Sequence, residues 1–174
     1  MATTAIGSSG ITYPNGATNG GYINSGTATA VSGTATGFTG IPSWVRKITL
    51  SLYRVQINSG SVFIIQLGSG SYTTTGYASA GTFIAPSTNV TNQTTGIAMS
   101  GPGYSSNSPA SGVMILANQG SNVWVGSGFV ADSNNTQNQF GAGSITLGGT
   151  LDRIQLTTSG GVTFTAGQIN ILYE

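Results

Sequence analysis

The stretch from Phe38 to Leu52 is the first part of the chain in which apolar and polar residues alternate regularly. Beyond Lys47 every second position is apolar: Ile48, Leu50 and Leu52. A period of two residues is typical of an antiparallel strand with one buried face. We therefore expect the folded body to begin here, with a strand from Trp44 onward. Trp44, at the edge of the core, and Trp124, in a later strand pattern, are both expected to be core residues.

Three later runs are also apolar and of strand length. Ser61–Leu67 is almost continuously apolar, which predicts a central strand covered on both faces. Val113–Ala117 predicts a second buried strand, and Val123–Val130 a third. Within the third run, Gly126 and Gly128 indicate a bulge or a close approach of another backbone.

The remaining segments are shorter. Gly68–Ser111 predicts two or three short strands joined by loops, and Ala131–Gln139 is polar enough to predict a loop. Four further strands are expected near the end of the chain: Ser144–Leu147, Thr150–Thr158, Val162–Phe164 and Gly167–Tyr173. No segment keeps a helical period through three turns. Short strands at this spacing predict an all-β, antiparallel β-sandwich that is jelly-roll-like.

Residues 1–37 form a low-complexity N-terminal arm in which small polar residues predominate. A few large apolar side chains interrupt it, among them Ile6, Ile11, Tyr13 and Tyr22. The composition allows a flexible tail, but the Pro14-Asn15-Gly16 turn signal after Ile11 and Tyr13 favours an extended arm that docks on neighbouring subunits. We expect two regions: the arm at 1–37 and a β-sandwich domain at 38–174.

The chain carries very little charge. Charged residues make up 4% of its 174 residues, against about 25% in ordinary soluble domains, and the net charge is +1. A neutral polar surface suits a protein packed into a larger assembly. The four basic residues are too few for nucleic-acid binding, and no polybasic or long apolar segment predicts a membrane partner.

Candidate chemistry is sparse. The chain has no Cys and no His, and its acids are Asp132, Asp152 and Glu174, the last expected to be mobile. Asp132 with Asn134 and Asn135 could offer oxygen ligands to calcium, but a polar loop is the favoured interpretation because calcium sites usually recruit more than one carboxylate. We expect no catalytic residues, no metal and no cofactor, and therefore a protein that is not an enzyme.

The scarce charges are candidate interaction residues. Asp152 and Arg153 are adjacent in an expected strand and would point to opposite faces, so we expect Asp152 to pair with Arg46, Lys47 or Arg54. The interaction residues predicted from the sequence are Ile6, Ile11, Tyr13, Tyr22, Arg46, Lys47, Asp152 and Arg153. Tyr72, Tyr77 and Tyr104 lie in loop-like regions, where aromatic rings could stack on a glycan, although packing is their commoner role.

Three stretches resemble a β-rich domain of tailed-bacteriophage structural proteins, including tail-fibre-like proteins. They are Phe38-Thr-Gly-Ile-Pro-Ser-Trp-Val-Arg-Lys-Ile48, Leu147-Gly-Gly-Thr-Leu-Asp-Arg-Ile-Gln-Leu-Thr-Thr158 and Phe164-Thr-Ala-Gly-Gln-Ile-Asn-Ile-Leu-Tyr-Glu174. The resemblance covers residues 38–174. In the arm, Ser9–Gly16 is similar to a short motif of phage fibre proteins. The family has no catalytic residues to transfer to this chain.

The resemblance implies a virion structural protein. A short arm without a fibre shaft favours a capsid decoration or cement protein, a homotrimer bound to the major capsid protein or another virion protein. It would be made in the host cytoplasm, because the N-terminal residues lack the features of a signal peptide, and then act at the virion surface. The alternative is a receptor-binding tip module of a tail or head fibre that contacts host glycan through Gly68–Ser111 or Ala131–Gln139. A depolymerase ranks third.

Overall fold

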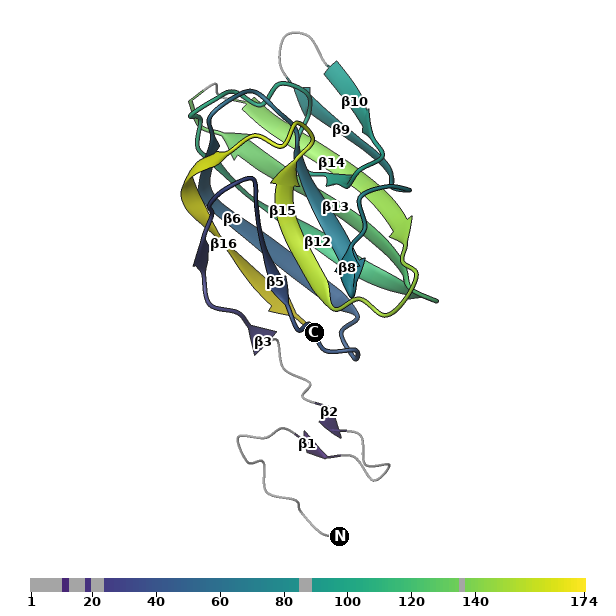
Figure 1. Ribbon diagram of the computed structural model, residues 1–174. Coiled ribbons are helices and arrows are strands. Elements are labelled where there is room, and N and C mark those ends of the chain that lie inside the picture. The colour runs from purple at the N-terminus through teal and green to yellow at the C-terminus, as the bar shows by residue number, and fades with distance from the viewer. Residues whose placement is uncertain (1–10, 13–17, 20–23, 85–88, 135–136) are drawn as a thin grey trace.

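The chain folds as a β-sandwich of two antiparallel sheets packed face to face (Figure 1), as the sequence predicted. The structure is a computed structural model that describes residues 11–12, 18–19, 24–84, 89–134 and 137–174. Within these residues there are strands and no helix. The described part of the chain accordingly contains no helix able to cross a bilayer.

The larger sheet has nine strands among the described residues. In spatial order they are β10 (Asn89–Gln93), β9 (Ala78–Ile84), β14 (Gln137–Thr146), β13 (Val123–Asp132), β12 (Ala110–Gly120), β6 (Lys47–Ile57) and β16 (Phe164–Tyr173), with β3 (Asn24–Ser25) and β4 (Thr29–Ala30) both paired to β16. The smaller sheet has the order β11 (Ile97–Ala98), β7 (Phe63–Ser69), β15 (Arg153–Thr158) and β5 (Ala35–Thr39), with β8 (Ser71–Tyr72) on β7. Separately, β1 (Ile11–Thr12) pairs with β2 (Thr18–Asn19).

The core lies between the two sheets. Ile48, Leu50 and Leu52 of β6 point into it, as their alternation predicted, and the β7 run is buried on both faces. Phe63 of β7 stacks on Phe164 of β16, with ring centroids 6.4 Å apart. Apolar burial between the sheets is therefore the main source of stability of the fold.

The first strands of the body lie beside the last ones. β5 pairs with β15 and β6 pairs with β16, which confirms the expected proximity of Phe38–Leu52 to Leu147–Glu174. Residues 24–37, which the sequence assigned to the arm, also contribute strands to the body through β3, β4 and most of β5. Val31 is buried in the core.

Two sequence expectations about β6 need correction. The strand begins at Lys47, because the backbone turns at Pro42, whose carbonyl accepts a 3.1 Å hydrogen bond from the Val45 N–H. Trp44 lies in this turn and is 41% exposed, packing its ring at the surface against Tyr173 at 5.8 Å. The predicted core tryptophan is thus correct for Trp124 alone, which is 1% exposed.

Several strands are longer than predicted. Gly68–Ser111 contains β8, β9, β10 and β11 and the first residues of β12. The expected polar loop Ala131–Gln139 is mostly strand, since β13 ends at Asp132 and β14 begins at Gln137. The polar residues of Ala131–Gln139 misled the prediction because two of them, Asp132 and Gln139, are buried in these strands with hydrogen-bond partners.

Glycines bring the two sheets unusually close at one end. Gly81 of β9 and Gly141 of β14 pair across the larger sheet and face inward. A side chain on Gly81 would overlap the carbonyl oxygen of Ser100, and one on Gly141 would overlap that of Ala98. The close backbone approach predicted at Gly126 and Gly128 is present at Gly128, where a side chain would overlap the Val113 carbonyl of the neighbouring strand β12, whereas at Gly126 the closest atoms belong to the side chains of Leu116 and Ile97.

Candidate functional site

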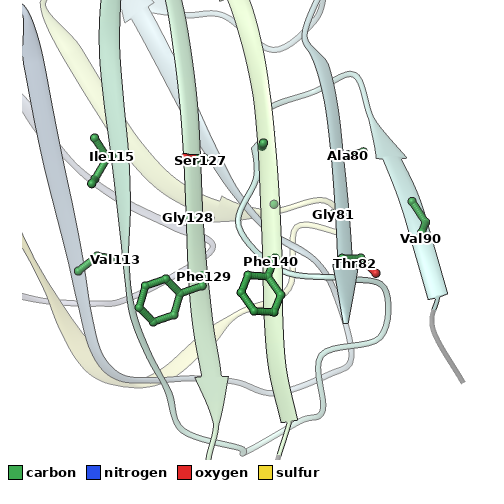
Figure 2. A pocket seen from close by; sticks show the side chains of 12 residues that line it. Ala80, Gly81, Thr82, Val90, Val113, Ile115, Ser127, Gly128, Phe129 and Phe140 are labelled. Atoms are coloured by element: carbon green, nitrogen blue, oxygen red, sulfur yellow. The ribbon is translucent and has the colours of Figure 1, made fainter. Parts of the chain in front are cut away.

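The most distinctive surface of the protein is the outer face of the larger sheet at β12, β13, β14, β9 and β10. Here a single cross-strand row carries large side chains (Figure 2). The residues directly paired along this row are Val113, Phe129, Phe140, Thr82 and Val90. Five neighbouring strands spaced about 4.8 Å apart make a row roughly 19 Å long. We call this row the ridge.

A second row of small side chains lies next to the ridge. Ser127, Ala142 and Ala80 pair directly across β13, β14 and β9, and Ile115 of β12 stands at one end of the row. We call Ser127, Ala142 and Ala80 the groove. The ridge and groove together line a shallow hollow of about 760 Å³. The face is therefore corrugated, with bulky and small residues in parallel rows.

The face exposes large apolar side chains to solvent. Phe129 is 46% exposed and Phe140 40%, and their ring centroids lie 6.5 Å apart. Ile115, Ile84 and Val90 are 44%, 59% and 66% exposed on the same side of the sheet. Contiguous apolar patches of this kind mark sites of contact with other molecules.

Charge is absent from this face. Asp132 is the only charged residue in β9, β10, β12, β13 and β14, and its side chain points to the opposite side of the sheet and is 1% exposed. A partner that covered the face would therefore not remove any charged side chain of this protein from water. Such a face favours a neutral partner surface.

The local sequence explains why the aromatic rings point outward. In β13 and β14 the inward positions next to the phenylalanines are Gly128 and Gly141. A side chain on Gly141 would overlap the Ala98 backbone, and one on Gly128 would overlap the Val113 carbonyl of β12. The usual arrangement of large apolar residues inside is thus reversed at this end of the sheet. Val113–Ala117 was expected to be a buried strand, but Ile115 is exposed because nothing in the described chain covers the outer face of β12.

This surface was not predicted, although the sequence contains one signal for it. The run Val-Met-Ile-Leu-Ala at 113–117 places apolar residues on both faces of a strand that belongs to an antiparallel sheet. Antiparallel sheets commonly expose one face. An apolar run on such a strand could therefore have been interpreted as a contact surface.

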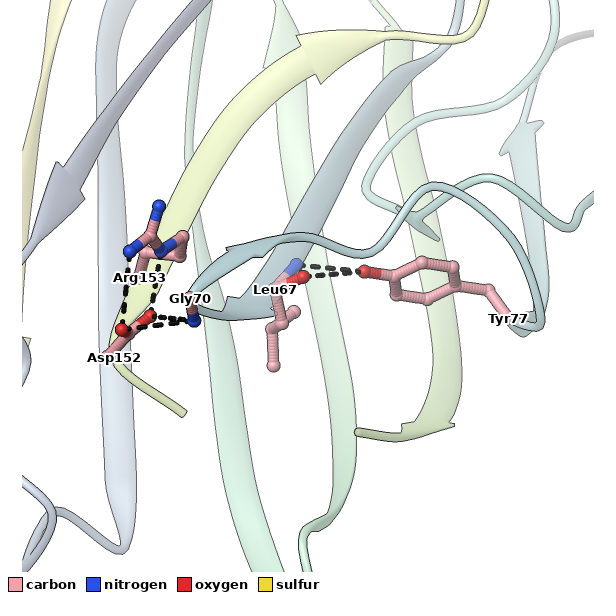
Figure 3. A network of polar contacts seen from close by, with 5 residues as sticks. All are labelled: Leu67, Gly70, Tyr77, Asp152 and Arg153. Carbon is pink, nitrogen blue, oxygen red and sulfur yellow. Dashed lines mark hydrogen bonds and ion pairs between the residues drawn. The ribbon is translucent and has the colours of Figure 1, made fainter. Parts of the chain in front are cut away.

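Asp152 and Arg153 form an ion pair, contrary to the sequence prediction. The Arg153 Nε donates to Asp152 Oδ1 at 2.7 Å, and the Gly70 N–H donates to the same carboxylate (Figure 3). Adjacent residues point to opposite faces only within a strand, and Asp152 lies before the start of β15. Arg153, followed by the Gly70 N–H, lowers the pKa of Asp152, and the bond to Asp152 raises the pKa of Arg153.

Lys47 pairs with Glu174 instead of Asp152. The expectation that Glu174 is mobile is wrong: its backbone carbonyl accepts from the N–H groups of Arg46 and Lys47, both at 2.9 Å. Its own N–H donates to the Lys47 carbonyl at 3.0 Å. Arg46 donates from its guanidinium to the backbone carbonyls of Ser43 and Val45. The side chains of Arg46, Lys47 and Glu174 therefore make their contacts within the chain, where β6 begins beside the end of β16.

The three candidate glycan-contacting tyrosines have different environments. Tyr77 is 3% exposed and Tyr104 fully buried, so neither ring can stack on a sugar. Burial raises the pKa of Tyr77 to about 12, and burial followed by the Asp132 carboxylate raises that of Tyr104. Tyr72 is partly exposed and lies under the Arg153 guanidinium, 5.7 Å from the ring centroid.

Four residues of the arm were predicted to dock on neighbouring subunits. Ile6, Tyr13 and Tyr22 lie outside the described residues, and Ile11 is described only as the first residue of β1. Their predicted docking role stays a prediction.

Asp132 is buried, and its described contacts are hydrogen bonds within the protein. Its carboxylate accepts hydrogen bonds from the Ser108 hydroxyl and, at 3.2 Å, from the Asn134 N–H. Asn135, the third residue considered for calcium, lies outside the described part of the chain. Among described residues there is no group of three or more acidic, His or Cys side chains placed to hold a metal ion.

Comparisons with known proteins give no assignment. No protein-family model matches the chain, and a search of curated proteins finds no match.

Proposed function

We propose that this protein is a bacteriophage virion structural protein, specifically a capsid decoration or cement protein that acts as a trimer on the head surface. The observation that carries the proposal is the uncharged apolar face formed by the ridge and the groove. A free monomer gains nothing from displaying such a face, whereas a protein built into an assembly buries it. The resemblance of residues 38–174 to phage structural domains supports the same conclusion.

The protein would act by buried area and not by chemistry. Its described surface carries two ion pairs, Lys47–Glu174 and Asp152–Arg153, and the side chains of both pairs remain accessible to water. Water screens ion pairs that are this accessible, so they add little to an assembly. Apolar burial is worth about 25 cal/mol per Å², which makes the sheet face the larger source of binding energy.

The copy number of the protein in purified virions tests the location. Quantitative mass spectrometry of intact particles should find hundreds of copies, as a protein that covers the head requires. A handful of copies per particle would contradict the decoration role and favour a fibre tip.

The arm can be tested separately. We expect a variant that lacks residues 2–23, and so keeps β3, to bind undecorated capsids more weakly than the full chain, with occupancy measured by co-sedimentation. Full occupancy by the truncated protein would show that the body alone docks and would remove the arm from the proposal.

A second candidate function has one observation in its favour. Tyr53 on the outer side of β6 is 60% exposed, pairs across the sheet with Gln168, and lines a shallow hollow of about 340 Å³ with Arg54 and Gln56. An exposed ring flanked by amides is suited to stacking on a sugar. Binding on a glycan array that is lost in Tyr53→Ala but kept in Tyr72→Ala would support a receptor-binding module, and polysaccharide cleavage would support an enzyme.

A further inference from the structure

The ridge and the groove form a face that has no partner in the described chain, and the identity of its partner can be argued from its size, charge and shape. Large apolar side chains bury about 200 Å² each, so the exposed fractions of Ile84, Val90, Ile115, Phe129 and Phe140 leave roughly 500 Å² of apolar surface. The small residues between them extend the face toward the roughly 800 Å² per partner of a standard interface.

The charge of the face restricts its partner. A surface without charged side chains pairs best with another neutral surface, because a charged partner would lose water without gaining an opposite charge. The outer face of β12, β13, β14, β9 and β10 in a second copy is itself such a surface. Charge therefore favours self-association.

The shape of the face leads to the same partner. Phe129 and Phe140 stand beside a row whose members are no larger than Ser127 and Ala142. Two sheets pack face to face about 10 Å apart, with side chains from one filling spaces between those of the other. A second copy presents both the ridge that fills this groove and the groove that accepts this ridge, which is the requirement for a symmetric interface.

We propose that copies of the chain associate through this face, with the ridge of one copy packed into the groove of another. This proposal rests on the proposed function, because both require the β-sandwich to act by burying its apolar face against another protein surface. A two-fold dimer buries the face by reciprocal contact, and the proposed trimer buries it by turning the face toward the three-fold axis. The full chain is therefore an oligomer in solution.

The test is the mass of the purified full chain, measured by light scattering after gel filtration at tens of micromolar. We expect two or three times the mass of one chain, and a fall to the mass of one chain in Phe140→Glu. The matched control is Tyr53→Glu, which introduces the same charge at an exposed aromatic residue on the same face of the sheet, outside the ridge and groove. It should leave the oligomeric mass unchanged.

A second variant guards against misfolding. Ala142→Arg places a charge in the groove at an exposed position, and it should also give a single-chain mass with an unchanged circular dichroism spectrum. A monomeric wild-type protein, an oligomeric Phe140→Glu or Ala142→Arg that is folded, or equal dissociation by Tyr53→Glu would each overturn the inference.

The other possible occupants are distinguished by the same measurement. If the full chain is a monomer and removal of residues 2–23 makes it associate, the face is covered by the chain's own arm. If both forms are monomers but capsids bind the wild type and reject Phe140→Glu, the face docks on the shell. Either result refutes self-association and leaves the virion role intact, whereas an oligomer present at only a few copies per virion refutes decoration alone.

Discussion

The hydroxyl of Tyr77 accepts a 2.8 Å hydrogen bond from the backbone N–H of Leu67 (Figure 3). β11 pairs with β7 only at Ile64 and Ile65, so Leu67 lies beyond the end of this neighbour. The same hydroxyl also donates to backbone carbonyls, including that of Thr73 at 3.0 Å. Tyr77 thus makes the hydrogen bonds to Leu67 that a neighbouring strand would otherwise make at this edge of the smaller sheet.

Tyr77→Phe should destabilise the protein by about 1–3 kcal/mol. The substitution keeps the ring in the core but leaves the buried Leu67 N–H without its acceptor, and an unsatisfied buried donor costs about that much. The free energy of unfolding in urea measures the effect. Tyr53→Phe is the control, because its side chain is 60% exposed and should change stability by less than about 0.5 kcal/mol. Equal effects of the two substitutions would contradict the edge role of Tyr77.

Stability should fall in alkaline solution between about pH 10 and pH 12. Burial raises the pKa of Tyr77 from 10.0 to about 12, so in this window the unfolded chain releases the proton and the folded protein keeps it. Stability is therefore complete below pH 10 and decreases as the pH rises, by about 1.4 kcal/mol per pH unit for this group. In Tyr77→Phe the slope of unfolding free energy against pH should be shallower by that amount. An identical slope in both proteins would show that Tyr77 titrates normally.

The fold could be predicted from the sequence where burial and alternation agree. The Ile48, Leu50 and Leu52 alternation identified β6, and the Ser61–Leu67 run identified β7, because each pattern reflects which faces of the strand are covered. The prediction failed at Ala131–Gln139. Gln139 is buried although it is polar, since its side-chain oxygen accepts a 2.9 Å hydrogen bond from the Gly101 N–H, and composition alone does not reveal such a partner.

The candidate site could not be predicted for a related reason. The phenylalanines of β13 and β14 point outward because the inward space beside them is already filled: at Gly141 by the Ala98 backbone, which is distant in the chain, and at Gly128 by the backbone of β12. Periodicity gives the two faces of a strand but not which face meets the core when one face is glycine and the other aromatic. Likewise, the Asp152–Arg153 ion pair depends on the backbone conformation just before β15, and the alternation of apolar and polar residues does not predict that conformation.

Gly141→Ala should destabilise the protein by roughly 1–3 kcal/mol. The new methyl group would meet the backbone of Ala98, which cannot move aside as a flexible side chain can, so the sheets must separate locally. Gly148→Ala is the matched control, because no atom lies within 4 Å of its added Cβ. Thermal unfolding should therefore show a clear loss for Gly141→Ala and little change for Gly148→Ala. Comparable melting temperatures would mean that the two sheets do not approach each other as closely as described.

Ser108→Ala should cost about 1–3 kcal/mol of stability, because the buried Asp132 carboxylate loses the hydroxyl that donates to it. Hydrogen bonds to charged groups are worth more than neutral ones, and water does not reach a carboxylate that is 1% exposed to replace the lost donor. Ser105→Ala, at an exposed position in the same segment, should be neutral. Urea unfolding of the two variants separates the effects. If Ser108→Ala is as stable as the wild type, the hydroxyl does not support Asp132, and the end of β13 is held by other contacts.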